Sequence, residues 1–160
     1  MKKNRAKIVF DARSINEGFA RMVVMGFMMD MNPTVDELQD VKTAVSEAVT
    51  NAIIHGYGER EDEKNESIYS YQVEMICVRE EQKLSVTVTD FGEGIENVEE
   101  ARQPFFTTKP EQERSGMGFA FMESFMDEVD VESKVGQGTR VTMSKYIKGE
   151  NKQIKECDAC

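Results

Sequence analysis

Near the start of the chain, a short strand-like run is followed by the apolar spacing of a helix. Residues 7–10 have the pattern of a strand. Ser14 and Glu17 have the spacing of a capping box, so we expect a helix from there to about Met31. Pro33 follows at once and would stop that helix.

The next segment carries the pattern of a longer helix. Thr34 and Glu37 match a second capping box, and the pattern predicts a helix through about Ile54. Gly56 and Gly58 suit its end. The apolar positions recur every three or four residues, so they form one stripe that would face a core. These positions are Leu38, Val41, Val45, Ala48, Val49 and Ala52.

The rest of the chain is richer in strand-forming residues. YSYQVEMICV and KLSVTVTD, separated by a polar turn, predict a β-hairpin. A third main helix is expected from Gly118 to about Met126, followed by a second hairpin, EVDVESKVGQGTRVTMSKYI. Because the helices cluster early and the strands pair locally, we predict an α+β two-layer α/β sandwich with helices on one sheet face. We expect a single domain over residues 1–146 and a disordered tail over 147–160.

Length and charge narrow the function classes. A chain of 160 residues fits one domain, and a net charge of −10 argues against nucleic acid and anionic membranes as partners. The longest apolar stretch, residues 22–29, is too short to span a bilayer, and no apolar segment follows the basic start as in a signal peptide. The three cysteines form no disulfide framework, so we expect a cytoplasmic protein. Two of them lie in the final CDAC, which has the spacing of redox and zinc sites without a second ligand pair.

Three pairs of glycines mark predicted element boundaries. They are Gly92 and Gly94, Gly116 and Gly118, and Gly136 and Gly138. Any one pair is most simply a turn. The second pair precedes a predicted helix, whose unpaired N–H groups attract anions, and two cations, Lys109 and Arg114, come just before it. The surrounding FFTTKPEQERSG is long and aperiodic, as ligand lids tend to be. A phosphate group fits this arrangement, although no P-loop or Rossmann signature is present.

Three polar residues are candidates for contacts with a nucleotide. Asp90 ends a β-branched strand, and its carboxylate could accept a hydrogen bond from an exocyclic amine, such as that of adenine, or cap the turn. Glu47 and Asn51 lie on one stripe of the second helix, where they could be polar surface. Beside a phosphate, however, Glu47 could act as a general base and Asn51 as a Mg²⁺ ligand. The glycine pairs favour this second interpretation.

The order of these motifs resembles the GHKL ATP-binding superfamily. E-x-x-x-N in a helix is followed by D-x-G-x-G, a lid ending in G-x-G, and G-x-G-T. Within the superfamily, SEAVTNAIIHGY, EARQPFFTTKPEQERSGMGF and FMDEVDVES are similar to the anti-sigma F factors of spore-forming bacteria (stage II sporulation protein AB). The similarity covers residues 7–146. It implies the Bergerat fold, with a mixed, mostly antiparallel sheet, and bound ATP or ADP with Mg²⁺.

The resemblance also implies roles for individual residues. Glu47 would be the catalytic base and Asn51 the Mg²⁺ ligand. Asp90 would read the adenine amine, with Gly94 beneath the ring and Thr139 in support. The other implied nucleotide contacts are Gly92, Thr107, Thr108, Lys109, Arg114, Ser115, Gly116, Met117 and Gly118.

The implied function is that of a homodimeric serine-protein kinase that also binds and inhibits the sporulation sigma factor sigma F. Its substrate would be a serine of the anti-anti-sigma protein, which relieves the inhibition when unphosphorylated. A general-stress-type anti-sigma kinase of the same family, or a nucleotide-dependent binding module without kinase activity, remains an alternative. The catalytic domain of a histidine kinase is disfavoured, because the chain's only histidine, His55, lies in the nucleotide-site helix. No direct contact with nucleic acid or membrane is expected.

Three features remain open at this point. We expect His55 to be structural or to support the nucleotide contacts indirectly. The five methionines between residues 22 and 31 could fill the core or form a dimer interface. Arg21, on the same helix, is a speculative partner contact and could equally be exposed surface.

Overall fold

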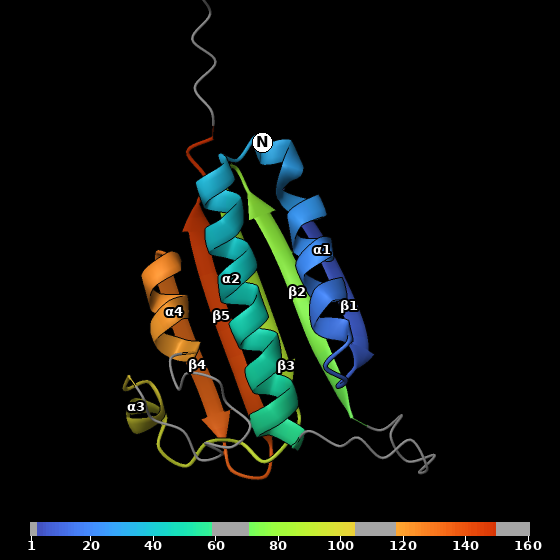
Figure 1. Cartoon of the computed structure of the whole chain (residues 1–160), viewed down its shortest axis with the longest axis vertical. Helices are drawn as coiled ribbons and strands as arrows, with labels where there is room; N and C mark the ends of the chain where they lie inside the picture. The colour runs from blue at the N-terminus through green and yellow to red at the C-terminus, as the bar shows by residue number, and fades with distance from the viewer. Residues whose placement is uncertain (1–2, 59–70, 105–117, 150–160) are drawn as a thin grey trace, which may run out of the picture.

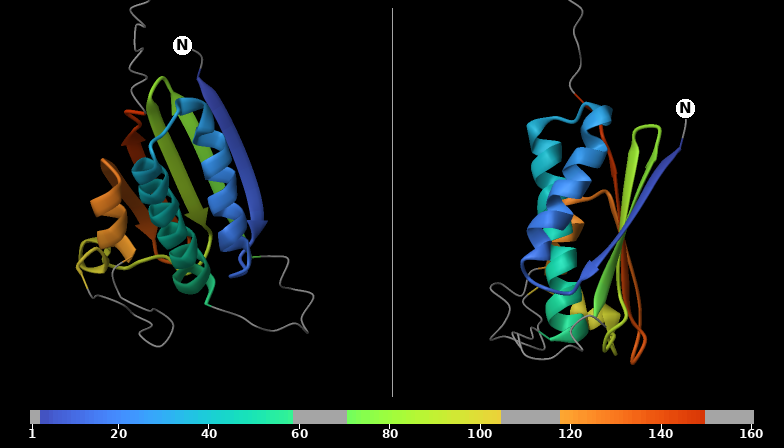
Figure 2. Two further views of the ribbon diagram at one scale, coloured as in Figure 1. Left: turned by 45° about the horizontal axis from the view of Figure 1, so that its top comes forward. Right: turned by 90° about the vertical axis from the view of Figure 1, so that its right-hand side faces the viewer.

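Five antiparallel strands form one layer of the structure, and helices cover one face of it (Figures 1 and 2). The computed structural model describes residues 3–58, 71–104 and 118–149. The α+β two-layer prediction is confirmed, but the sheet expected to be mixed has only antiparallel pairings in this part of the chain, in the order β1-β2-β3-β5-β4. The strands are β1 (Asn4–Asp11), β2 (Gln72–Glu80), β3 (Lys83–Asp90), β4 (Glu128–Lys134) and β5 (Gly138–Tyr146).

Three main helices make the second layer (Figure 1). They are α1 (Asn16–Met28), α2 (Val35–Asn51) and α4 (Gly118–Phe125). Shorter turns follow two of them and precede the third: η1 (Met29–Met31), the π-helical η2 (Ala52–Tyr57) and α3 (Val98–Ala101). Both predicted hairpins are present, whereas the one-turn α3 was not foreseen. Within the described residues, no helix is long and apolar enough to cross a membrane.

The hydrophobic core lies between the layers and is centred on α2. Val41, Val45 and Val49 of the predicted stripe are fully buried, against the inward residues of the sheet. On β2 and β3 those residues alternate along each strand, as expected for a sheet with one covered face. Burial of each such side chain contributes about 1.5–3 kcal/mol, so this stripe fixes the position of α2 on the sheet.

The two predicted capping boxes have different outcomes. At Thr34 the box is confirmed, with reciprocal hydrogen bonds to Glu37. The box predicted at Ser14 is wrong, because α1 begins at Asn16 behind a residue without a side-chain cap. The Glu17 carboxylate instead accepts a hydrogen bond from Ser46 on α2 and pairs with Arg21, at 3.1 Å from its Nε atom. The Glu17 side chain thus contacts α2 and does not cap the start of α1.

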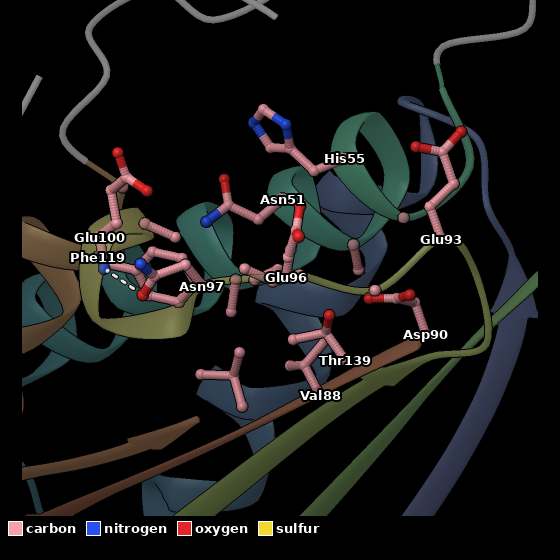
Figure 3. Close-up of a pocket in the computed structure, with 18 of the residues that line it drawn as sticks. Asn51, His55, Val88, Asp90, Glu93, Glu96, Asn97, Glu100, Phe119 and Thr139 are labelled. Carbon is pink, nitrogen blue, oxygen red and sulfur yellow. Dashed lines mark hydrogen bonds between the residues drawn. The ribbon is translucent and has the colours of Figure 1, made fainter. Parts of the chain in front are cut away.

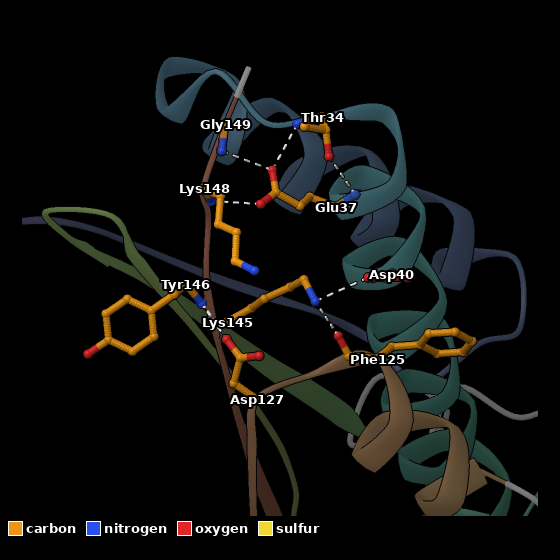
Figure 4. Close-up of polar contacts among 9 residues, drawn as sticks. All are labelled: Thr34, Glu37, Asp40, Phe125, Asp127, Lys145, Tyr146, Lys148 and Gly149. Atoms are coloured by element: carbon orange, nitrogen blue, oxygen red, sulfur yellow. Dashed lines mark hydrogen bonds and ion pairs between the residues drawn. The ribbon is translucent and has the colours of Figure 1, made fainter. Parts of the chain in front are cut away.

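The segment of residues 147–149, which follows β5, is hydrogen-bonded to the start of α2 (Figure 4). The Glu37 carboxylate accepts hydrogen bonds from the N–H groups of Lys148 (2.6 Å) and Gly149 (3.2 Å), besides that of Thr34 (2.9 Å). Ile147, which we assigned to the tail, is 1% exposed and belongs to the core. Residues 150–160, with the CDAC sequence, lie outside the described residues.

Candidate functional site

A cavity of about 930 Å³ opens at the C-terminal end of α2 (Figure 3). It brings together Asn51, Asp90, Gly94, Gly118 and Thr139, which come from separate segments of the chain and were all predicted to contact a nucleotide. Its volume is in the range of small-molecule and cofactor sites. The cavity therefore collects five of the predicted contact residues around a space large enough for a small ligand.

Asp90 is the buried acid of the cavity. It ends β3, is 4% exposed, and its carboxylate accepts hydrogen bonds from the N–H groups of Gly92 (3.0 Å) and Thr139. Burial raises the pKa of Asp90 to about 6, although these two hydrogen bonds and the nearby His55 lower it. A carboxylate has acceptor positions beyond two, so Asp90 can still receive a hydrogen bond from a ligand.

The glycines around Asp90 are required by close backbone packing. A Cβ atom at Gly56 would lie 2.7 Å from Asp90 Cγ, and one at Gly92 would lie 1.8 Å from the carbonyl oxygen of Gly56. Gly94 has a φ of +74°, and its Cβ would lie 2.2 Å from the carbonyl oxygen of Lys134. Gly94 lines the cavity and Gly92 does not. The D-x-G-x-G sequence thus allows the loop after β3 to pass between η2 and the β4–β5 turn.

Tyr57 fixes the beginning of this loop. Its hydroxyl accepts a hydrogen bond from the N–H of Phe91 (2.8 Å) and donates one to the carbonyl of Gln72 (2.6 Å). Tyr57 is 8% exposed, and burial raises the pKa of its hydroxyl. We did not predict a role for Tyr57. The one signal in the sequence was its place between Gly56 and Gly58, at the end of the predicted helix.

Ser133 fixes the end of the same loop. Its hydroxyl accepts a hydrogen bond from the N–H of Ile95 (2.8 Å) and lies 2.8 Å from the hydroxyl of Thr139. Thr139 therefore supports the site in two ways, through its backbone to Asp90 and through Ser133 to the loop. Nothing in the sequence singled out Ser133.

Glu47 and Asn51 of α2 and His55 of η2 lie at different positions relative to the cavity. Asn51 and His55 line the cavity (Figure 3). Glu47 is not a lining residue, but its carboxylate lies near Gly118, which is one. The start of α4 covers the two predicted phosphate-side residues, because a Cβ at Gly118 would lie 3.0 Å from Asn51 Nδ2 and 3.3 Å from Glu47 Oε2. The helix changes from α to π just after Asn51, a local widening often found at functional sites.

The charges suggest an orientation for an anionic ligand. Glu93, Glu96 and Glu100 line the cavity, and Glu93 lies on its Asp90 side (Figure 3). Phosphate groups would be repelled there, whereas the N-terminus of α4 at Gly118 carries a partial positive charge. In the part of the chain that the structure describes, no group of three acidic, histidine or cysteine side chains could hold a metal by itself.

Seven of the thirteen predicted nucleotide contacts cannot be placed. They lie between α3 and α4, outside the described residues: Thr107, Thr108, Lys109, Arg114, Ser115, Gly116 and Met117. Arg21 is described, and it lies on α1, outside the cavity, paired with Glu17.

Sequence comparison identifies the domain. Residues 10–145 match the sequence model of the histidine kinase-like ATPase domain. The anti-sigma F factor of Anoxybacillus flavithermus is 52% identical over 145 residues, covering 91% of this chain and 94% of that protein. The anti-sigma F factor of Clostridium perfringens (strain SM101) is 53% identical over 144 residues, covering 90% of this chain and 97% of that protein.

A solved structure supports the fold independently. The crystal structure of the RsbU and RsbW domains of Rv1364c from Mycobacterium tuberculosis matches with a TM-score of 0.59 and 17% identity, covering 90% of this chain and 32% of that one. At this identity the similarity concerns the fold alone. The family match over nearly the whole domain and the identity above 50% show that this chain belongs to the histidine kinase-like ATPase family and, within it, to the anti-sigma F factors.

Proposed function

We propose that this protein binds Mg-ATP in the cavity, phosphorylates a serine of an anti-anti-sigma protein, and binds and inhibits the sporulation sigma factor sigma F. The observation that carries the proposal is the position of Glu47 and Asn51 beneath the start of α4. Asp90 lies in the same cavity, on the loop side. One site thus offers an acceptor for a purine amine and, at a helix N-terminus, a carboxylate and an amide for the phosphate end.

The nucleotide would lie with its base at Asp90 and its phosphates at Gly118. Asp90 has acceptor capacity for the exocyclic amine of adenine, and Gly94 allows the base to approach the backbone. The opposite orientation would place the phosphates beside Asp90 and Glu93, which carry the same sign of charge. Electrostatics therefore favours a single orientation.

Phosphoryl transfer requires an acceptor that loses its proton. The serine hydroxyl oxygen would bond to the γ-phosphorus as the bond to the β–γ bridging oxygen breaks, and ADP would leave. Glu47 would accept the hydroxyl proton, since a carboxylate beside the γ-phosphate is suited to that role. The Asn51 side-chain oxygen is a hard ligand that fits Mg²⁺, which when bound neutralises phosphate charge. A passive nucleotide site would gain nothing from a carboxylate beside the phosphates, which would only repel them.

A second copy of the chain is the proposed partner of α1. Ile15, Phe19, Met22 and Met29 are 51–82% exposed and recur at helical spacing, whereas Met28 and Met31 are buried. The methionines of α1 and η1 therefore divide between core and surface. An exposed apolar stripe of this kind is typical of an interface, and we propose a homodimer that uses it. Arg21 is the proposed contact for the sigma factor or the anti-anti-sigma protein, and these partners imply a cytoplasmic location.

Two measurements on the purified full chain test the proposal. With Mg²⁺ and γ-labelled ATP, a small anti-anti-sigma protein should acquire one labelled serine. Immobilised chain should retain sigma F, with retention that differs between ATP and ADP. Absence of labelled serine would overturn the kinase half and favour a nucleotide-dependent binding module. Retention of a general-stress sigma factor in place of sigma F would favour the related alternative.

A further inference from the structure

An ion pair joins two walls of the cavity. Arg102 follows α3, and its Nε and Nη2 atoms lie 2.7 Å and 2.6 Å from Oε1 of Glu123 on α4. The two side chains are 30% and 40% exposed. Neither residue lines the cavity, and the proposed function uses neither of them.

The wall formed by α4 is firmly anchored. Met122 on this helix is fully buried, and α4 packs along α2 and contacts β4. Gly118 and Phe119 at its start line the cavity. Burial in the core holds α4 in place, so Glu123 occupies a fixed position on the surface of this wall.

The wall formed by α3 is held differently. None of its four residues is buried, so apolar packing contributes little to its position. The Asn97 side chain caps it by accepting a hydrogen bond from the N–H of Glu100 (3.1 Å), and Glu100 and Ala101 line the cavity (Figure 3). On its N-terminal side, the N–H of Ile95 is held by a serine hydroxyl of β4. On its C-terminal side, Arg102 forms the ion pair with Glu123.

We propose that the Arg102–Glu123 ion pair holds the α3 wall against α4 and thereby slows dissociation of the nucleotide. The inference rests on the proposed function, because the nucleotide is the proposed occupant of the cavity. Both are positioning residues that act through Glu100 and Ala101. Because both side chains are partly exposed, the contribution of the pair is modest and decreases as salt is added.

Dissociation of the fluorescent nucleotide mant-ADP from the full chain tests this. Arg102→Ala and Glu123→Ala should each accelerate dissociation about two- to fivefold, in keeping with a partly exposed ion pair. The double alanine variant should dissociate no faster than either single variant, since one contact is lost in all three. The exchanged pair, Arg102→Glu with Glu123→Arg, should recover most of the slow dissociation. The effect of each single variant should shrink at high ionic strength.

Arg140→Ala is the matched control. Arg140 also pairs with a glutamate, Glu132, at 3.5 Å, but both side chains are exposed on the sheet and neither lines the cavity. Its loss should leave the rate unchanged. Wild-type rates in Arg102→Ala and Glu123→Ala, or single effects that multiply in the double variant, would overturn the inference while leaving the proposed function intact. Failure of the wild-type chain to bind mant-ADP would overturn both.

Discussion

Gly56 packs directly against the side chain of Asp90, with no room for a methyl group between them. A Cβ atom at Gly56 would lie 2.7 Å from both Cγ and Oδ1 of Asp90. Gly56→Ala should therefore displace the carboxylate or the π-helical turn, lower the free energy of unfolding by about 1–3 kcal/mol and weaken ADP binding. Urea unfolding and ADP titration measure the two effects.

Gly26→Ala provides the control for that substitution. Gly26 lies in α1, and nothing would lie within 4 Å of its Cβ. Alanine there should stabilise the protein by about 0.5–1 kcal/mol, because glycine is unfavourable inside a helix. Wild-type ADP affinity in Gly56→Ala would show that the site does not depend on this contact.

The raised pKa of Asp90 predicts that ADP binding depends on pH. Burial raises this pKa to about 6, so Asp90 is ionised at pH 7 and becomes protonated below pH 6. A protonated carboxyl is a poorer acceptor for the adenine amine, so ADP affinity should fall as the pH drops from about 7.5 to about 5. Calorimetric titration of wild-type protein and Asp90→Asn measures this, and the variant should bind weakly with little pH dependence. His55 also lies near Asp90, so ADP binding to His55→Asn should be measured over the same pH range. Loss of the pH dependence in that variant would assign the effect to His55 and not to Asp90.

The same pKa has the opposite effect on stability. The folded state holds the Asp90 proton more tightly than the unfolded state, whose ordinary value is 3.8. The contribution of Asp90 is therefore complete below about pH 3.8 and is lost as the pH rises through about 6, a change of about 3 kcal/mol. Relative to Asp90→Asn, wild-type protein should lose stability between about pH 4 and pH 6. A constant difference across that range would contradict the assignment.

The hydroxyl of Tyr57 should contribute to both fold and site. Tyr57→Phe removes the partner of two backbone groups, the N–H of Phe91 and the carbonyl of Gln72, and should cost about 1–3 kcal/mol of unfolding free energy. ADP affinity should fall as well, because Phe91 adjoins Asp90. Tyr146→Phe is the control, since Tyr146 is 56% exposed. Equal stability of the two variants would argue against this role for the Tyr57 hydroxyl.

The helices and the hairpins could be predicted because they follow from the periodic spacing of apolar residues and from local turn residues. The stripe on α2 selects the face that packs on the sheet, and this orientation carries Asn51 into the cavity. The two hairpins follow from the sequence pattern, whereas the pairing of β3 with β5, which brings Asp90 beside Thr139, joins the two hairpins and was not predicted. Period and turn chemistry act locally, so sequence spacing reveals them.

The features that we missed depend on contacts between distant segments. Glu17 does not have its predicted capping role, and its carboxylate accepts a hydrogen bond from Ser46 on another helix. Tyr57 and Ser133 hold opposite ends of one loop, and their partners are far away in the sequence. The one-turn α3 buries no residue, so it leaves no apolar period in the sequence.

Glu37 should stabilise the fold through the chain segment after β5. Burial raises the pKa of Glu37, but hydrogen bonds from Thr34, Lys148 and Gly149 lower it by more, so the net pKa is below the usual value. Glu37→Gln should reduce the free energy of unfolding by about 1–3 kcal/mol at pH 7. A carboxyl group whose pKa is lower in the folded state stabilises the fold at pH values above its pKa in the unfolded state. This contribution is lost as the pH falls through the folded-state pKa, so the stability difference between wild type and Glu37→Gln should shrink in acid. A difference that stays constant down to about pH 3 would exclude this charge effect.

Glu47 and Asn51 should affect different steps of the proposed reaction. Glu47→Gln keeps the shape of the side chain but cannot accept the serine proton, so phosphorylation of the anti-anti-sigma protein should fall at least about 100-fold with ATP affinity nearly unchanged. Asn51→Ala removes a metal ligand, so ATP affinity should lose most of its dependence on Mg²⁺. Asp36→Asn, an exposed change at the opposite end of α2, is the control and should alter neither. Unaltered phosphorylation in Glu47→Gln would remove Glu47 as the base, and unaltered Mg²⁺ dependence in Asn51→Ala would remove Asn51 as the ligand, so the two assignments stand or fall separately.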